Sequence, residues 1–239
     1  MNVKNHSLEV RCDYIDAIDV AEVLIHSIVF FRTCGKFTYR QEASYSVGTL
    51  GYEEVDCTRL NYTYVRCSSP TLINMIDSKL QGFSSKINDN SSSATLLLEF
   101  YFKRPNRWPF NDSKIVWESW NIKLVFNTPS AHQDTNAQTC GLRFDLENTL
   151  SQKLIDVVTI VNKEGHSLPQ MPTQTNFENI FDSSFVDSQP YLFALSYKIS
   201  DNIRKHTTKP CDQSKDMLEF SSAPRRSSLQ KFLLETLEL

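Results

Sequence analysis

The sequence has few glycines and lacks a long apolar run. Only six glycines occur in 239 residues, and none belongs to a glycine-rich phosphate loop. No apolar segment approaches the roughly 20 residues that a membrane-spanning helix needs, and the first residues include no apolar signal region. We therefore expect a cytosolic or nuclear protein without a transmembrane segment.

The residues that usually build catalytic or metal sites are scattered. The six cysteines contain no close pair of the zinc or redox type, so free and mostly buried thiols are expected. The five histidines belong to no recognisable motif, and neither H-E-x-x-H nor G-x-S-x-G occurs. His26 is interpreted as a satisfied core histidine rather than a ligand or base. The sequence thus predicts no catalytic residues, no metal site and no cofactor.

Composition and charge are those of an ordinary globular protein. Hydrophobic residues make up 40% and charged residues 22% of the chain, which suits one large domain. A net charge of -3 provides no overall attraction to nucleic acid. No nucleic-acid partner is therefore expected.

Periodicity predicts the elements of the first half. Leu8 to Tyr14 alternates like a short strand, and an almost wholly apolar helix follows, with Asp19 and Glu22 as a capping-box-like pair and Gly35 as its stop. Residues 37–64 are strands and turns. Ser69 and Pro70 then begin an amphipathic helix whose apolar stripe continues to Ile87.

Residues 104–120 form the most distinctive stretch. Period-two alternation on both sides predicts a long hairpin, with Trp120 in the core and Trp117 against the other face or the hairpin base. The loop itself carries Trp108 and Phe110 on either side of Pro109. Two interpretations stay open: the rings fold back into the core, or they protrude as an anchor for a partner.

The second half adds a helix, a strand and a polar tail. A polar linker over 128–137 precedes a helix from Asp145 to Asn162, whose stripe includes Val158 and which ends at Gly165. Tyr191 to Ile199 alternates as a strand. Residues 201–227 are expected to be a flexible linker, and residues 228–239 an amphipathic helix.

Several short segments resemble one family in the same order along nearly the whole chain. They include Gly35-Lys36-Phe37, Tyr45-Ser46-Val47-Gly48-Thr49, Arg107-Trp108-Pro109-Phe110, Trp117-Glu118-x-Trp120, Met171-Pro172-Thr173-Gln174 and Gln189-Pro190-Tyr191-Leu192. Together they are similar to the autophagy-related protein 101 family. Residues 201–227 depart from it, because they look longer than the family's usual connection to the last helix.

The resemblance implies an α+β HORMA domain over residues 1–200, with three main helices on a mostly antiparallel sheet and a protruding hairpin loop. It implies a non-enzymatic scaffold of the autophagy-initiation kinase complex that pairs with the HORMA domain of autophagy-related protein 13. Trp108, Pro109 and Phe110 would be its WF finger, flanked by Arg104 and Arg107, which recruits downstream factors at the preautophagosomal structure in the cytoplasm. The family pattern favours display of both rings.

Three alternatives remain. A HORMA peptide clamp in a chromosomal or checkpoint assembly would grip a ligand with the strand at 191–199 and the tail behind it. The finger would make peripheral membrane contact if its rings and the basic Arg104, Arg107 and Lys114 entered a lipid interface, but so few groups give weak affinity, so protein contact is favoured. The last alternative is an enzyme whose site is assembled from distant residues.

Overall fold

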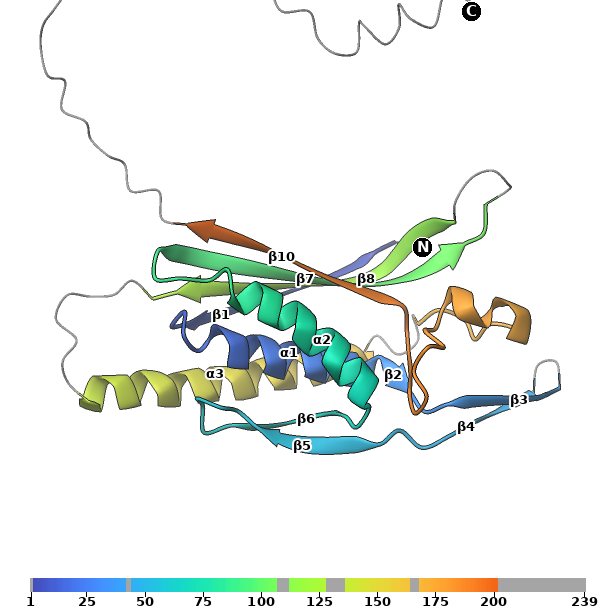
Figure 1. The fold of residues 1–239 in the computed structure, drawn as a ribbon, viewed down its shortest axis with the longest axis horizontal. Coiled ribbons are helices and arrows are strands. Elements are labelled where there is room, and N and C mark those ends of the chain that lie inside the picture. Colours follow the sequence, from blue (N-terminus) through green and yellow to red (C-terminus); the bar gives the residue numbers. More distant parts are fainter. Residues whose placement is uncertain (1, 42–43, 107–111, 128–135, 164–167, 202–239) are drawn as a thin grey trace, which may run out of the picture. The chain divides into compact units, whose positions relative to one another are not determined.

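The main sheet joins strands from both ends of the domain (Figure 1). In this computed structural model, which describes residues 2–41, 44–106, 112–127, 136–163 and 168–201, the strand order is β1 (Lys4–Cys12), β8 (Ser113–Phe126), β7 (Ser91–Arg104) and β10 (Phe193–Asp201). β1 is parallel to β8, whereas the β7–β8 and β7–β10 pairs are antiparallel. The predicted α+β class with a mostly antiparallel sheet is confirmed.

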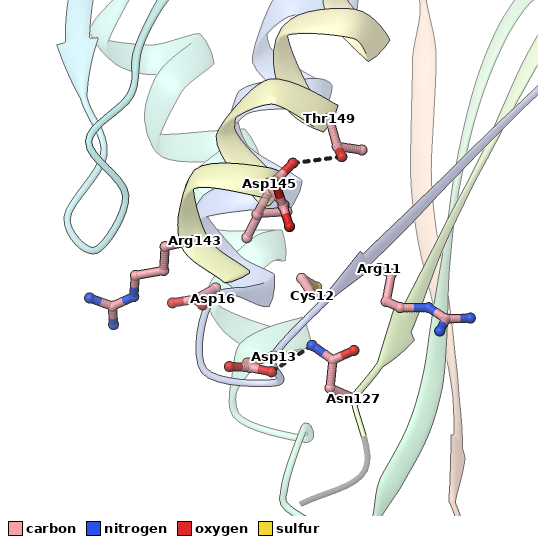
Figure 2. A pocket seen from close by; sticks show the side chains of 9 residues that line it. Arg11, Cys12, Asp13, Asp16, Asn127, Arg143, Asp145 and Thr149 are labelled. Carbon is pink, nitrogen blue, oxygen red and sulfur yellow. Dashed lines mark hydrogen bonds between the residues drawn. The ribbon is translucent and has the colours of Figure 1, made fainter. Parts of the chain in front are cut away.

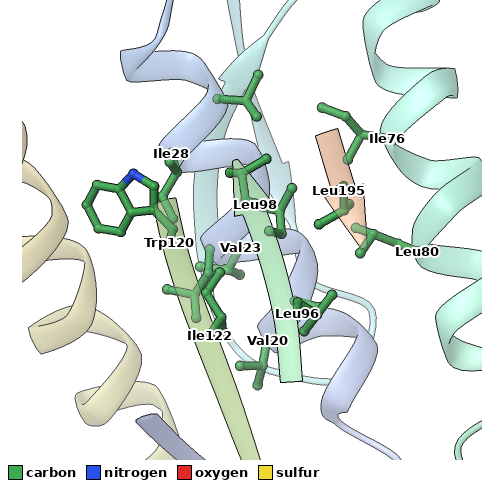
Figure 3. Packing of buried hydrophobic residues seen from close by; sticks show 14 of the residues in the cluster. Val20, Val23, Ile28, Ile76, Leu80, Leu96, Leu98, Trp120, Ile122 and Leu195 are labelled. Carbon is green, nitrogen blue, oxygen red and sulfur yellow. The ribbon is translucent and has the colours of Figure 1, made fainter. Parts of the chain in front are cut away.

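Three helices lie on one face of this sheet (Figure 1): α1 (Ala17–Phe31), α2 (Pro70–Ser84) and α3 (Asn136–Lys163). α1 is buried almost all round, as its nearly unbroken apolar sequence predicts. α2 buries a single stripe, because its apolar residues recur every three or four positions. Figure 3 shows the resulting core, in which α1, α2 and the sheet meet through Val20, Val23, Ile28, Ile76, Leu80, Leu96, Leu98, Trp120, Ile122 and Leu195.

Smaller two-stranded sheets surround the helices. β3 (Phe37–Gln41) pairs with β4 (Ser44–Val47), and β5 (Tyr52–Asp56) pairs with β6 (Thr63–Cys67) on the side of the helices away from the main sheet (Figure 1). β2 (Thr33–Cys34) pairs with β9 (Gln189–Pro190), and the 3-10 helix η2 spans Gln174–Asn179. The strand-and-turn prediction for residues 37–64 is confirmed.

The predicted start of the first helix is wrong by three residues. Asp16, not Asp19, is the N-cap of α1, and its side chain makes no capping hydrogen bond. Asp19 lies in the first turn, where its carboxylate accepts a hydrogen bond from the backbone N–H of Arg59 at 2.7 Å. A partner 40 residues away has replaced the expected local capping box.

Gly35 does not end the helix, because Arg32 is the C-cap. Its role is close packing: a Cβ built on Gly35 would lie 1.9 Å from the carbonyl oxygen of Gly48. The backbone N–H of Gly48 donates to the Lys36 carbonyl at 2.7 Å. Only glycine allows the two segments to approach this closely.

Other boundaries differ from the predictions at polar ends. α3 begins at Asn136 rather than Asp145, and Val158, expected in its buried stripe, is 38% exposed. β1 begins at Lys4 and β10 ends at Asp201, which extends both strands into polar sequence. Within the described residues, no helix is long and apolar enough to cross a membrane. The linker beyond Asp201, the helix at 228–239 and the helix stop at 165 lie outside those residues.

Candidate functional site

β7 and β8 carry the loop singled out in the sequence. Their register is regular from Ser93 to Phe100 and then shifts, since Phe100 pairs with Glu118 whereas Tyr101 pairs with Val116. Trp117 is therefore the extra residue of a β-bulge. It is 2% exposed, and its ring lies 5.8 Å from Phe100, so the bulge turns the residue inward where strict alternation predicted the opposite face from Trp120.

A buried ion pair fixes the stem of this hairpin to the helices. Nε and Nη2 of Arg32, at the end of α1, donate to the two carboxylate oxygens of Glu118 on β8 at 2.6 and 2.7 Å. The two side chains are 2% and 1% exposed. The bidentate geometry satisfies both charges and makes the pair strongly directional. The stem therefore has one well-defined position against α1.

Arg32 also connects the stem to the segment before β10. Its carbonyl accepts the backbone N–H of Tyr191 at 3.1 Å, and its guanidinium lies 5.9 Å from the centre of the Trp117 ring. The Tyr191 ring lies 5.3 Å from Trp117. α1, β8 and the residues around 191 thus meet at one buried group.

The outer end of the stem is basic. Lys103 is paired with Lys114, and Arg104 with Ser113, at the ends of β7 and β8. Lys114 Nζ lies 2.8 Å from Glu99 Oε2 and 4.8 Å from the centre of the Tyr101 ring. Arg104, one of the predicted flanking residues, is exposed. Arg107, Trp108, Pro109 and Phe110 lie outside the described residues.

His26 is a satisfied core histidine. It is 3% exposed, and its Nε2 lies 2.9 Å from Asp77 Oδ1 on α2. Arg66 Nε on β6 donates to Glu53 Oε1 at 2.7 Å. Burial, together with the charges of Asp77 and Asp19, raises the pKa of Glu22 on α1 to about 7. This arrangement links α1, α2 and β6 and leaves the His26 ring no access to a substrate.

The remaining polar groups form no recognisable catalytic or metal site in the described part of the chain. No three His, Cys, Asp or Glu side chains among the described residues are placed to hold a metal ion. His6 lies 3.5 Å from Glu118, and burial lowers the pKa of its imidazole. Burial raises the pKa of the Cys12 thiol to about 12, which makes it unreactive. His132, His166 and His206 lie outside the described residues.

An apolar hollow of about 300 Å³ opens between α1, β6 and α3. We call it the apolar face. Phe31 and Val158, two of its lining residues, are 37% and 38% exposed. The full lining is Ser27, Phe30, Phe31, Thr63, Tyr64, Val65, Leu154 and Val158. Exposed apolar side chains around a hollow are typical of a protein-binding surface.

The sequence patterns did not single out two buried acidic residues, Glu118 and Asp16. Glu118 could have been found, because it alternates with Trp120, Ile122 and Leu124 on the apolar side of its strand. Its partner Arg32 could not have been found from the sequence, since it is 86 residues away. Asp16 gave no signal, because the predicted helix began at Asp19 and a polar residue just before a helix is ordinary.

These features define an α+β domain whose described candidate sites are the basic end of the hairpin stem and the apolar face. Residues 9–175 match the family described as Autophagy-related protein 101. Proteins of that name from Xenopus tropicalis and Homo sapiens are 36% and 33% identical to the chain, each over 210 residues that cover 87% of this chain and 94% of the relative.

The chain belongs to the autophagy-related protein 101 family. Membership gives it an autophagy-related role. The resemblance expected from the sequence motifs is confirmed.

Proposed function

We propose that this protein is a non-enzymatic adaptor of the autophagy-initiation kinase complex. In this proposal residues 1–200 are a HORMA domain that pairs with and stabilises the HORMA domain of autophagy-related protein 13. Residues 201–227 are a flexible linker to a helix at 228–239. The observation that carries the proposal is the family match over residues 9–175, which includes both strands of the hairpin and the loop between them. The proposed place of action is the preautophagosomal structure in the cytoplasm.

The apolar face is the surface we propose for the pairing. Its hollow is lined by side chains of α1, β6 and α3, and its exposed members would lose contact with water on association. The core of a stable interface is apolar and depleted of charge, which suits this surface and not the basic end of the stem.

A charge placed on the apolar face tests the pairing. Val158→Asp should weaken co-purification with the autophagy-related protein 13 homologue of the same organism by at least about tenfold, because a carboxylate would be buried without a partner. The matched control is Phe144→Asp, since Phe144 is also exposed on α3 at 63% but does not line the hollow. Equal loss in both variants, or none in Val158→Asp while the fold is intact by circular dichroism, would contradict this surface.

Trp108, Pro109 and Phe110 are the proposed recruiting finger. The double variant Trp108→Ala, Phe110→Ala should keep the thermal midpoint and the pairing but lose recruitment of downstream autophagy factors in cells. Support for a presenting role comes from the stem, which the buried Arg32–Glu118 pair holds in one position.

The control for the finger is Val186→Ala, which removes an apolar side chain that is 83% exposed elsewhere on the domain. It should leave recruitment unchanged. An unfolded double variant would mean that the rings belong to the core. A folded variant that still recruits would remove the finger from the proposal and leave the pairing untouched.

A further inference from the structure

A polar pocket of about 230 Å³ lies where β1, the start of α1, the end of β8 and α3 meet. Figure 2 shows the side chains that line it, which come from segments more than 100 residues apart. They are Arg11, Cys12, Asp13, Asp16, Asn127, Arg143, Asp145, Leu146 and Thr149. The pocket shares no lining residue with the apolar face.

Asp16 is the unusual member of this lining. The residue is 2% exposed, yet its Oδ1 atom accepts no hydrogen bond. It occupies the N-cap position of α1 without making the capping bond that an aspartate usually makes there. An ionised carboxylate buried without a partner destabilises a protein, so its presence calls for a compensating role.

The neighbouring polar groups are mostly engaged with one another. Asn127 Nδ2 donates to Asp13 Oδ1 at 2.8 Å, and Thr149 Oγ1 donates to the Asp145 carbonyl at 2.8 Å (Figure 2). Arg143 is exposed, and its charge partly offsets the burial that raises the pKa of Asp16, but it gives Oδ1 no hydrogen bond. The buried oxygen of this lining that accepts no hydrogen bond is therefore Asp16 Oδ1.

The chemistry of the lining selects the ligand. Three carboxylates and two guanidinium groups line the space, which leaves an excess of one negative charge. A bare metal ion does not suit it, since no three potential ligands among the described residues are close enough. The volume is several times the roughly 30 Å³ that one water molecule occupies in the liquid, so it admits an organic cation.

We propose that this pocket binds an alkylammonium or alkylguanidinium group, with Asp16 as its charge acceptor and Asp13 and Asp145 beside it. A lysine or arginine side chain of a partner protein carries this chemistry, and so does a free polyamine. The bound cation would donate to the Asp16 carboxylate and neutralise the buried charge. The buried carboxylate, whose Oδ1 accepts no hydrogen bond, lowers the stability of the free protein, and ligand binding removes that deficit.

The test compares the full-length chain with Asp16→Asn. Asparagine has nearly the same shape but no charge, so the free variant should melt at a higher temperature than the wild type. It should also lose at least about tenfold in affinity for the cation, because a charge-assisted hydrogen bond is lost. Binding would be followed by amide NMR shifts at the start of α1 and by the thermal midpoint, with ligands at about 10 mM.

A set of test ligands distinguishes the two sources of the cation. They are butylammonium, butylguanidinium, spermidine, and the capped peptides Gly-Lys-Gly and Gly-Arg-Gly, with Gly-Gln-Gly as the neutral control. Tighter binding of the peptides identifies a protein side chain, and tighter binding of spermidine identifies a polyamine. The control variant is Asp89→Asn, the same change at an exposed position, which should change neither the thermal midpoint nor the affinity for the cation.

Two results would overturn the proposal. The first is an absence of any cation-dependent shift in the wild type. The second is a lower thermal midpoint in Asp16→Asn that Arg143→Gln reproduces, since Arg143 would then be the internal partner of Asp16 and the pocket would be closed by the protein itself.

Discussion

Two buried carboxylates in this domain have opposite surroundings. Glu118 is 0% exposed and accepts two short hydrogen bonds from Arg32. Asp16 is 2% exposed, and its Oδ1 accepts none. A buried charge that is fully paired fixes the position of the elements that carry it, whereas one left unpaired is available to something else. The first suits the support of a hairpin, and the second suits a binding pocket.

Breaking the paired site should produce the larger effect. Glu118→Gln leaves the Arg32 guanidinium buried without a counter-charge, so the free energy of unfolding should fall by roughly 3–5 kcal/mol. Urea denaturation followed by tryptophan fluorescence measures this directly, since the Trp117 ring lies 5.9 Å from the Arg32 guanidinium. The loss should come with a destabilised stem, because the pair connects β8 to α1.

Two controls separate the buried pair from pairs in general. The double variant Arg32→Met, Glu118→Leu removes both charges and should recover most of the loss. Lys123, on the same strand as Glu118, forms an exposed pair with Glu9 on β1; Lys123→Ala breaks that pair and should have no measurable effect. A loss in Glu118→Gln no greater than in Lys123→Ala would show that Arg32 and Glu118 do not support the fold.

The sequence could predict features that depend on local patterns, but not those that depend on contacts between distant residues. The helices α1 and α2 and the strands β7 and β8 were predicted because hydrophobic periodicity is a local property that burial on one or more faces imposes. The first turns of α3 were missed although Leu142 lies four residues before Leu146 and continues its stripe; Gly141, a poor helix former, interrupts the pattern there. The alternation of β8 is enough to place Glu118 on the apolar side of its strand, but its partner depends on chain packing that no local pattern records.

The candidate sites also differ in how far the sequence predicted them. Trp108 and Phe110 stood out because aromatic rings are unexpected in a polar loop, and the family resemblance gave them a role that still stands as a proposal. The sequence did not predict the polar pocket, because its residues come from three separate stretches of the chain and each residue is ordinary in its own context. Of the two positions predicted for Trp117, the face opposite Trp120 is wrong, since a β-bulge breaks the alternation on which that prediction depended.

Glu22 provides an intermediate case between the two carboxylates and should give the smallest effect. It is partly exposed, and burial, followed by the charges of Asp77 and Asp19, raises its pKa from 4.5 to about 7, against an opposing contribution from Arg66. The folded state therefore holds the proton more tightly than the unfolded state, so stability falls as pH rises from about 4.5 to about 7. Glu22→Gln cannot ionise, and it should lack this decline.

With allowance for solvent screening, the difference should be about 1 kcal/mol. Urea denaturation of the wild type and Glu22→Gln at pH 5 and pH 8 measures it, with Glu54→Gln as the control on the neighbouring β5 strand. The variant should gain stability over the wild type at pH 8 relative to pH 5. A gap between the two proteins that is the same at both pH values would mean that Glu22 is already ionised in the folded state. It would then have to be counted with Glu118 among the satisfied carboxylates, which would leave Asp16 as the buried acid with an oxygen that accepts no hydrogen bond in the described fold.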